Sequence, residues 1–177
     1  TCALPISTVT HFMIARKLLE LGKHVLVEKP MTAQAWEAAE LVRLAAQRGC
    51  VLQVGHVERF NPVFQQLQAL APEPRFIEVH RLGAFPERSL DIDVVFDLMI
   101  HDLDVVLSLV DSDVTAIEAV GVPVLTGRVD IANARLKFAN GCIANVTASR
   151  ISRDRVRKIR FFQPMAYLSI DYAAQKV

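Results

Sequence analysis

Two short apolar runs, each preceded by an amphipathic helix pattern, constrain the fold of the first third of the chain. Residues 8–21 carry apolar side chains at helical spacing, and Gly22 follows as a stop signal. Residues 24–27 then form a short apolar run, which predicts a strand buried on both faces of a parallel sheet. A second predicted helix, capped by Thr32, and a second run at residues 51–54 repeat the pattern. This alternation predicts the carboxyl half of a Rossmann-like, doubly wound α/β domain.

Beyond the second apolar run the pattern changes to alternating strands around one long helix. Residues 93–110 predict that helix, and Asn140-Gly141 predicts a two-residue hairpin. Strands are predicted at residues 76–82, 114–120, 131–138, 142–149, 157–162 and 167–172. We therefore expect a partial Rossmann-like domain over residues 1–56. Residues 57–177 should form an α+β domain whose mostly antiparallel, open sheet carries helices on one face only.

Composition and charge limit the classes of partner. The chain is 52% hydrophobic with a formal net charge of +1, and its acids and bases are interleaved. This balance lacks the basic footprint of a nucleic-acid-binding protein and favours a small molecule or another protein chain as partner. No apolar run is long enough to span a membrane and no secretion signal opens the sequence, so we expect a cytoplasmic protein with no membrane partner. The three cysteines fit no zinc spacing, and we expect them to pack as buried thiols.

Glu28, Lys29 and Pro30 follow the first apolar run directly. Ligands of open α/β sheets bind outside the carboxyl ends of parallel strands, so these residues lie at a candidate site. Pro30 ends the strand, and a cis bond before it would hold Lys29 in a tight turn. Lys29 could then donate to a substrate hydroxyl or to a cofactor amide. The alternative is a solvated surface lysine, and the residues alone leave both open.

Asp97 and His101 are four residues apart in the predicted helix, which places them on one face. The positions around them are mostly apolar, so a carboxylate and an imidazole there cost desolvation energy unless they are paired or used. An aspartate can fix the tautomer of a histidine that acts as a general base. The alternatives are a helix-surface pair and a metal site. Two ligands without a third make the metal site a weak interpretation, and we predict no metal.

Polar residues also crowd segment 55–62, which follows the second apolar run. Arg59 could bind a carboxylate or phosphate with two hydrogen bonds, and Asn61 could meet a hydroxyl. Alternatively the segment is a domain linker in which Asn61 caps a helix that begins at Pro62. His11, in the first turn of the first predicted helix, is interpreted as a packing or capping histidine.

Three motifs of the sequence together resemble one protein family. They are residues 18–30, which end in Glu-Lys-Pro; residues 54–56 with 59–62; and the D-x-x-x-H-x-x-D pattern of residues 97–104. In this order and spacing they resemble the glucose–fructose oxidoreductase / inositol dehydrogenase (Gfo/Idh/MocA) family over residues 8–177. The second and third motifs are similar to those of nucleotide-sugar 3-dehydrogenases.

The resemblance implies an oxidoreductase that transfers a hydride between a ring carbinol of a sugar or nucleotide sugar and a nicotinamide cofactor. That cofactor is NAD or NADP, with NAD favoured. Catalytic roles are implied for Lys29, His101 and Asp97, with His101 as the acid/base. Cofactor contacts are implied for Glu28, Lys29, Pro30 and His11, and substrate contacts for Arg59, Asn61, Asp97 and His101. Homo-oligomers that form through the open sheet are also implied.

The chain departs from the family pattern in ways that limit these expectations. No G-x-G-x-x-G fingerprint occurs, so the part of the Rossmann domain that binds the pyrophosphate is expected to be missing. Residues 1–7 match poorly and are expected to be non-native, and the second domain is expected to be truncated at its carboxyl end. The fragment alone is therefore expected to be inactive. A catalytically inactive sugar-sensing or scaffold protein with the same fold is the alternative.

Overall fold

The computed structural model describes residues 2–4, 8–62, 64, 67, 70, 73–85, 92–172, 174 and 176. The chain divides into two compact units, Thr1–Val57 and Glu58–Val177. Each unit contains its own cluster of buried hydrophobic residues, so each is stabilised by contacts of its own. Among the described residues, no helix is long and apolar enough to cross a membrane.

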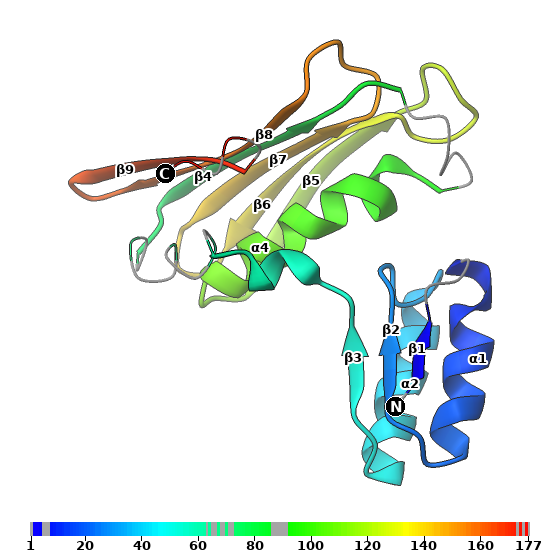
Figure 1. Ribbon diagram of the computed structural model, residues 1–177. Helices are drawn as coiled ribbons and strands as arrows, with labels where there is room; N and C mark the ends of the chain where they lie inside the picture. The colour runs from blue at the N-terminus through cyan, green and yellow to red at the C-terminus, as the bar shows by residue number, and fades with distance from the viewer. Residues whose placement is uncertain are drawn as a thin grey trace. The chain divides into compact units, whose positions relative to one another are not determined.

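The first unit is a three-stranded parallel sheet with two helices (Figure 1). Its strands, in order across the sheet, are β1 (Cys2–Leu4), β2 (Val25–Val27) and β3 (Leu52–Val54). Its helices are α1 (Thr8–Glu20) and α2 (Ala35–Arg48). The predicted order of helix, strand, helix and strand is confirmed. The sequence prediction lacks β1, because no helix pattern and glycine precede its three residues, as they precede those of β2 and β3.

Both helices of the first unit pack on the same face of its sheet. One buried cluster joins them to β2 and consists of Ala15, Leu19, Val25, Val27, Leu41 and Ala45. Leu26 points to the opposite face, since successive strand residues alternate, and it is 36% exposed. The expectation of strands buried on both faces is therefore wrong for this chain, because the described helices cover one face only.

The start of α2 differs from the prediction that Thr32 caps it. Thr32 is buried, and its hydroxyl donates to the carbonyl oxygen of Gln34 at 2.8 Å, so it stabilises the turn before the helix. Gln34 is the N-cap residue instead, and its backbone amide donates to Glu37 Oε2 at 3.1 Å. This contact is half of a capping box, which satisfies an amide that the helix itself leaves without a partner.

The second unit is a six-stranded mixed sheet with strand order β5-β6-β7-β4-β8-β9 (Figure 1). The strands are β4 (Phe76–Leu82), β5 (Val114–Val122), β6 (Ile131–Phe138), β7 (Ile143–Ser149), β8 (Val156–Gln163) and β9 (Ala166–Asp171). Strands β4 and β7 are parallel, and every other neighbouring pair is antiparallel. The predicted mostly antiparallel, open sheet is confirmed. One face carries helix α4, and no helix of the described residues covers the other.

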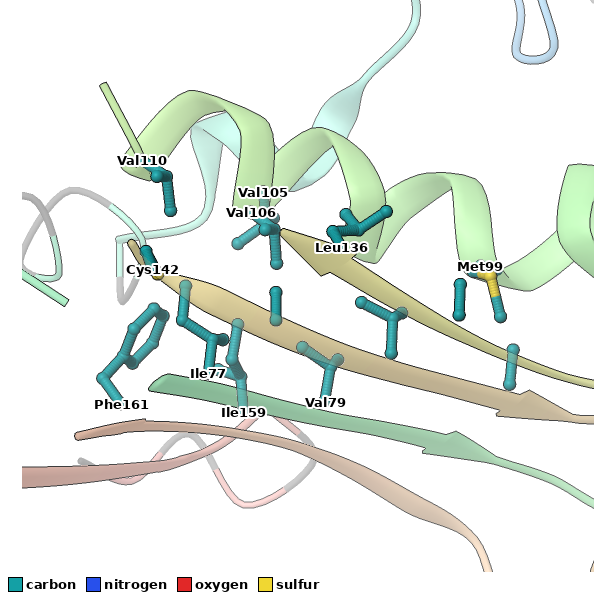
Figure 2. Close-up of a cluster of buried hydrophobic side chains, with 14 of the residues drawn as sticks. Ile77, Val79, Met99, Val105, Val106, Val110, Leu136, Cys142, Ile159 and Phe161 are labelled. Carbon is teal, nitrogen blue, oxygen red and sulfur yellow. The ribbon is translucent and has the colours of Figure 1, made fainter. Parts of the chain in front are cut away.

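A single hydrophobic core fills the space between this sheet and α4 (Ile100–Leu109). Figure 2 shows Val105 and Val106 of α4 above Ile77 and Val79 of β4, and all four side chains are at most 2% exposed. Burying a side chain of this size stabilises the fold by roughly 1.5–3 kcal/mol. The alternation of apolar residues along β4 therefore decides which face of the sheet the helix covers.

The helix predicted over residues 93–110 forms, but it contains one irregular turn. Val95–Met99 is a π-helical turn, η2, in which the amide of Ile100 donates to the carbonyl oxygen of Val95. Helix α4 continues from there with regular geometry. A π-turn adds a residue to the helix and rotates the side chains on its two sides relative to each other, and such turns occur often at functional sites.

A buried ion pair lies in the second unit, close to the segment that leads into this helix. Arg150 Nε donates to Asp130 Oδ1 at 2.8 Å, and both side chains are at most 1% exposed. Asp130 Oδ2 accepts the backbone amides of residues 124–126 in the loop between β5 and β6. Arg150 Nη1 also donates to the carbonyl oxygen of Ile92 at 2.8 Å. These bonds connect the β5–β6 loop to the segment that leads into the helix.

We expect Asp130 to make the folded chain sensitive to acid. Burial alone would raise its pKa, but hydrogen bonds from backbone amides, Thr126 and Arg150 hold the pKa of this carboxyl well below its usual range. The unfolded chain then takes up this proton at a higher pH than the folded chain, so stability is complete above about pH 4 and falls as the pH drops further. Urea-unfolding midpoints should therefore decrease from about pH 5 to about pH 2. The variant Asp130→Asn should have a lower urea-unfolding midpoint at pH 5, and its midpoint should change less with pH. An equal change of midpoint with pH in the two proteins would contradict this.

Candidate functional site

In the first unit, the Glu-Lys-Pro segment forms the turn at the carboxyl end of β2. The Lys29–Pro30 peptide bond is cis, and Lys29 is half-buried. His11 of α1 is 1% exposed, and its Nδ1 lies 2.9 Å from the carbonyl oxygen of Pro30. Because a carbonyl oxygen can only accept, Nδ1 must be the protonated nitrogen. His11 therefore holds the turn against α1.

Glu28 is exposed, and its carboxylate lies beside Gly55, the residue that follows β3. A Cβ atom at Gly55 would lie 3.0 Å from Glu28 Oε2, so a side chain there would displace the carboxylate. The amide of Gly55 donates to the carbonyl oxygen of Val27 at 2.8 Å, which extends the pairing of β2 and β3 to their ends. The turns after β2 and β3 thus meet at one edge of the parallel sheet, where the strand-end rule locates ligands.

In the second unit, Asp97 lies in the π-turn and His101 lies in the first turn of α4; both are half-buried. Their spacing of four residues spans the junction between the π-helical and α-helical segments. The sequence predicts regular i, i+4 stacking of the two side chains. The extra residue of the π-turn changes this geometry. Both residues nevertheless lie in one continuous helical segment packed against the sheet.

The helix is fixed to the sheet by an ion pair at the residue after His101. Arg81 of β4 donates from Nε to Asp102 Oδ2 at 2.7 Å and from Nη2 to Asp102 Oδ1 at 2.9 Å. The two side chains are 5% and 4% exposed. Glu58 of the 3₁₀ turn η1 (Val57–Phe60) adds a second carboxylate at 3.6 Å from Arg81. An arginine that occupies an inward position of a strand is thus matched by two carboxylates.

Burial raises the pKa of the Asp102 carboxyl, and the hydrogen bonds from Arg81 oppose that rise. A buried pair of this kind adds little net stability compared with well-packed apolar residues, because desolvation of the two charges offsets their attraction. Its geometric effect is larger. Two parallel hydrogen bonds accept one orientation, so they fix the rotation of α4 on the sheet and with it the position of His101.

Arg59 forms a second two-bond pair with the same helix. Its Nε donates to Asp104 Oδ2 at 2.8 Å, and its Nη2 donates to Asp104 Oδ1 at 2.7 Å. The two-bond carboxylate contact expected of Arg59 toward a substrate is made here within the chain. Asn61 is half-buried, and its carbonyl oxygen accepts the amide of Phe64 at 2.9 Å. The helix predicted after Asn61 lies partly outside the described residues.

Sequence reasoning missed Arg81 and Asp102, and it assigned Glu58 to a substrate hydroxyl rather than to Arg81. A signal for Arg81 exists, because a charged residue at an inward position of an alternating strand requires a buried partner. The thiols of Cys50 and Cys142 are free; Cys142 is buried, whereas Cys50 is only half-buried. Across the part of the chain that the structure describes, no group of three His, Cys, Asp or Glu residues could hold a metal ion.

Two family models match the chain. Residues 3–56 match the oxidoreductase family with an NAD-binding Rossmann fold. Residues 73–162 match the GFO/IDH/MocA C-terminal domain. The chain therefore belongs to the GFO/IDH/MocA oxidoreductase family, which confirms the resemblance based on its three motifs.

Known relatives refine this placement. The chain is 43% identical over 166 residues to UDP-N-acetylglucosamine 3-dehydrogenase of Acidithiobacillus ferrooxidans, covering 93% of this chain and 53% of that protein. It is 32% identical over 115 residues to inositol 2-dehydrogenase of Rhodococcus jostii, covering 61% of this chain and 31% of that protein. The solved structure of the A. ferrooxidans enzyme, GnnA, matches with a TM-score of 0.92 at 41% identity, over 98% of this chain and 58% of that one. The chain thus spans about half the length of the first relative and about a third of the second.

Removing Asp102 alone should destabilise the second unit strongly. The variant Asp102→Ala leaves Arg81 buried with only the more distant Glu58, which should lower the free energy of unfolding by about 3–5 kcal/mol. The double variant Arg81→Met/Asp102→Leu replaces both charges with apolar groups and should lose far less. Urea unfolding followed by circular dichroism distinguishes the two. Equal losses in the single and double variants would show that the pair matters only through packing.

Proposed function

We propose that the protein containing this chain is a nicotinamide-dependent dehydrogenase that oxidises a ring carbinol of a nucleotide sugar to a ketone. The observation that carries the proposal is that Asp97 and His101 are both half-buried in one helical segment. The Arg81–Asp102 pair fixes that segment to the sheet. Similarity to a UDP-N-acetylglucosamine 3-dehydrogenase supports the substrate class. Because the chain spans about half of that relative, the activity is proposed for a longer protein. In it, residues 1–56 would belong to the cofactor domain and residues 57–177 to the substrate domain.

The turn after β2 has donors that fit a nicotinamide cofactor. Lys29 is half-buried at a strand end, and His11 and Pro30 hold the turn that presents it. We assign Glu28, Lys29 and Pro30 to cofactor contacts and His11 to the support of that turn. The bound nicotinamide ring supplies hydride acceptance, a redox chemistry that no amino-acid side chain offers. Of the two forms, NAD is the one proposed.

The chemistry assigned to the chain's own residues is proton transfer and positioning. His101 takes the proton of the substrate hydroxyl as the carbinol hydrogen leaves as hydride. Asp97 orients the substrate or the imidazole, and Lys29 donates a hydrogen bond to the reacting oxygen. Asn61 is assigned to a substrate hydroxyl. Arg59 already binds Asp104, so we propose that it acts on the substrate through that carboxylate.

Association of copies through the open sheet is part of the same proposal. β5 is an edge strand, and every residue after Val114 in it is exposed. Ile117 and Val120 of this strand are 65% and 60% exposed. An exposed apolar edge strand invites pairing with another chain, which supports an oligomer.

Replacing His101 should slow the reaction without preventing substrate binding. In the longer protein, His101→Ala should lower kcat with UDP-N-acetylglucosamine by ~10²–10⁴, the usual contribution of a general base. The rate is followed through the absorbance of the reduced cofactor. His80→Ala, at a position of β4 that points away from α4, is the matched control. Unchanged turnover in His101→Ala would remove this residue from the mechanism, and sugar binding without any turnover would favour a sensing or scaffold protein.

The chain of 177 residues by itself should bind NADH only weakly. It contains no G-x-G-x-x-G turn, which in Rossmann domains places the pyrophosphate at a helix N-terminus. Titration followed by NADH fluorescence measures the affinity. A dissociation constant in the micromolar range or below would show that the assigned cofactor contacts suffice without the fingerprint.

A further inference from the structure

Two arginines lie directly opposite each other in the sheet of the second unit. Arg81 of β4 is in register with Arg157 of β8. Residues opposed in an antiparallel pair have Cβ atoms about 4.5–5.5 Å apart and point to the same face, so like charges there repel. Both arginines belong to the face that packs against α4, in the same alternation as the core residues Ile77, Val79, Ile159 and Phe161.

The charge of Arg81 is compensated, whereas that of Arg157 is not. Asp102 and Glu58 both contact Arg81. Among the described residues, none forms a hydrogen bond or salt bridge with the Arg157 guanidinium. Burial and the nearby cations of Arg81 and Arg155 lower the pKa of Arg157, although Glu58 and Asp102 act on it in the opposite sense. A half-buried cation beside other cations is unfavourable until an anion joins it.

Tyr172 completes the row across the sheet. Its amide donates to the carbonyl oxygen of Arg157 at 2.9 Å, in continuation of the β8–β9 pairing. Its hydroxyl oxygen is buried and has no hydrogen-bond partner among the residues that the structure describes. Burial and the carboxylates of Asp102 and Glu58 raise the pKa of Tyr172, so the hydroxyl keeps its proton and can donate. Arg157 and Tyr172 are thus adjacent donors for which the described chain supplies no acceptor.

We propose that Arg157 and Tyr172, with Arg155 at the rim, form a subsite for the diphosphate of a nucleotide-sugar substrate. A guanidinium binds phosphate oxygens through two parallel N–H bonds, and a tyrosine hydroxyl can donate a third. The subsite also lies near the proposed base, because Asp102, which contacts Arg81, directly follows His101 in α4. This inference rests on the proposed function, which supplies the substrate class.

The arrangement also explains why the donors face a substrate rather than the protein. Asp102 and Glu58 are the carboxylates that act on Arg157, and both are already held by Arg81. Arg157 therefore adds a positive charge for which no described carboxylate forms a salt bridge. A diphosphate brings the missing negative charge and acceptor oxygens together in one group.

Isothermal titration of the 177-residue chain with UDP, inorganic pyrophosphate and uridine tests the subsite. UDP and pyrophosphate should bind, and uridine should bind at least about tenfold more weakly, since loss of charged hydrogen bonds costs that much. Arg157→Gln should weaken UDP binding about tenfold to a hundredfold, and Tyr172→Phe should weaken it severalfold. Arg153→Gln removes the same charge from an exposed position of the β7–β8 loop and should leave binding nearly unchanged. Equal weakening by Arg157→Gln and Arg153→Gln, or no binding of UDP by the unmodified chain, would overturn the proposal.

A second measurement separates lost binding from lost folding. Arg157→Gln removes a repulsive cross-strand pair, so without ligand its thermal unfolding midpoint should equal or exceed that of the unmodified chain. Saturating pyrophosphate should raise the midpoint of the unmodified chain but not that of the variant. A lower midpoint of the ligand-free variant would mean that the chain itself already compensates Arg157. Binding through Arg157 without turnover in the longer protein would refute the dehydrogenase, whereas turnover with UDP binding indifferent to Arg157→Gln would refute only the subsite.

Discussion

The buried pair of Arg81 and Asp102 joins an inner strand of the sheet to the helix that carries the proposed base. Apolar side chains alone would hold α4 on the sheet, but they permit small rotations at little cost in buried area. The two buried hydrogen bonds of 2.7 and 2.9 Å between Arg81 and Asp102 do not permit such rotations. Because His101 precedes Asp102, the orientation that satisfies this pair is also the orientation that presents the imidazole.

The same pair determines the electrostatics of its surroundings. Asp102 and Glu58 pair with Arg81, so Arg157, the arginine opposite Arg81 in the sheet, has cations nearby and no salt bridge to a described carboxylate. The interaction that fixes the orientation of the helix thereby leaves an unpaired cation beside it, which an anion would neutralise. Under the proposed function, a nucleotide sugar supplies that anion with its diphosphate, while its ring carbinol is oxidised. The orientation of the helix and the proposed choice of substrate then depend on one charge network.

Local patterns in the sequence account for most of the fold. The bounds of β4 and β6 are predicted to the residue, because an alternating pattern, interrupted in β4 only by the inward Arg81, and an Asn-Gly turn are signals that need no distant partner. The π-turn at Val95–Met99 is not predictable in this way, since one added residue scarcely alters an apolar helix pattern. The exposure of Leu26 depends on which helices cover its face, and that is not a local property either.

The candidate site was accessible from the sequence only where its residues form short motifs. Lys29 follows a recognisable strand, and Asp97 and His101 share one helix pattern. The partner of Arg81 lies 21 residues away along the chain, and several other carboxylates stand at comparable separations. Pattern alone shows that Arg81 occupies an inward position; only the packing of α4 on β4 selects Asp102.

The most direct test of the central claim is to follow the hydrogen itself. UDP-N-acetylglucosamine carrying deuterium at the sugar carbon that 3-dehydrogenation oxidises should be incubated with the longer protein and NAD. Mass spectrometry of the cofactor should then find the deuterium on the reduced nicotinamide, with its rate of appearance reduced in His101→Ala. Binding of the sugar without transfer of the label, or reduced cofactor that carries no deuterium, would contradict the account.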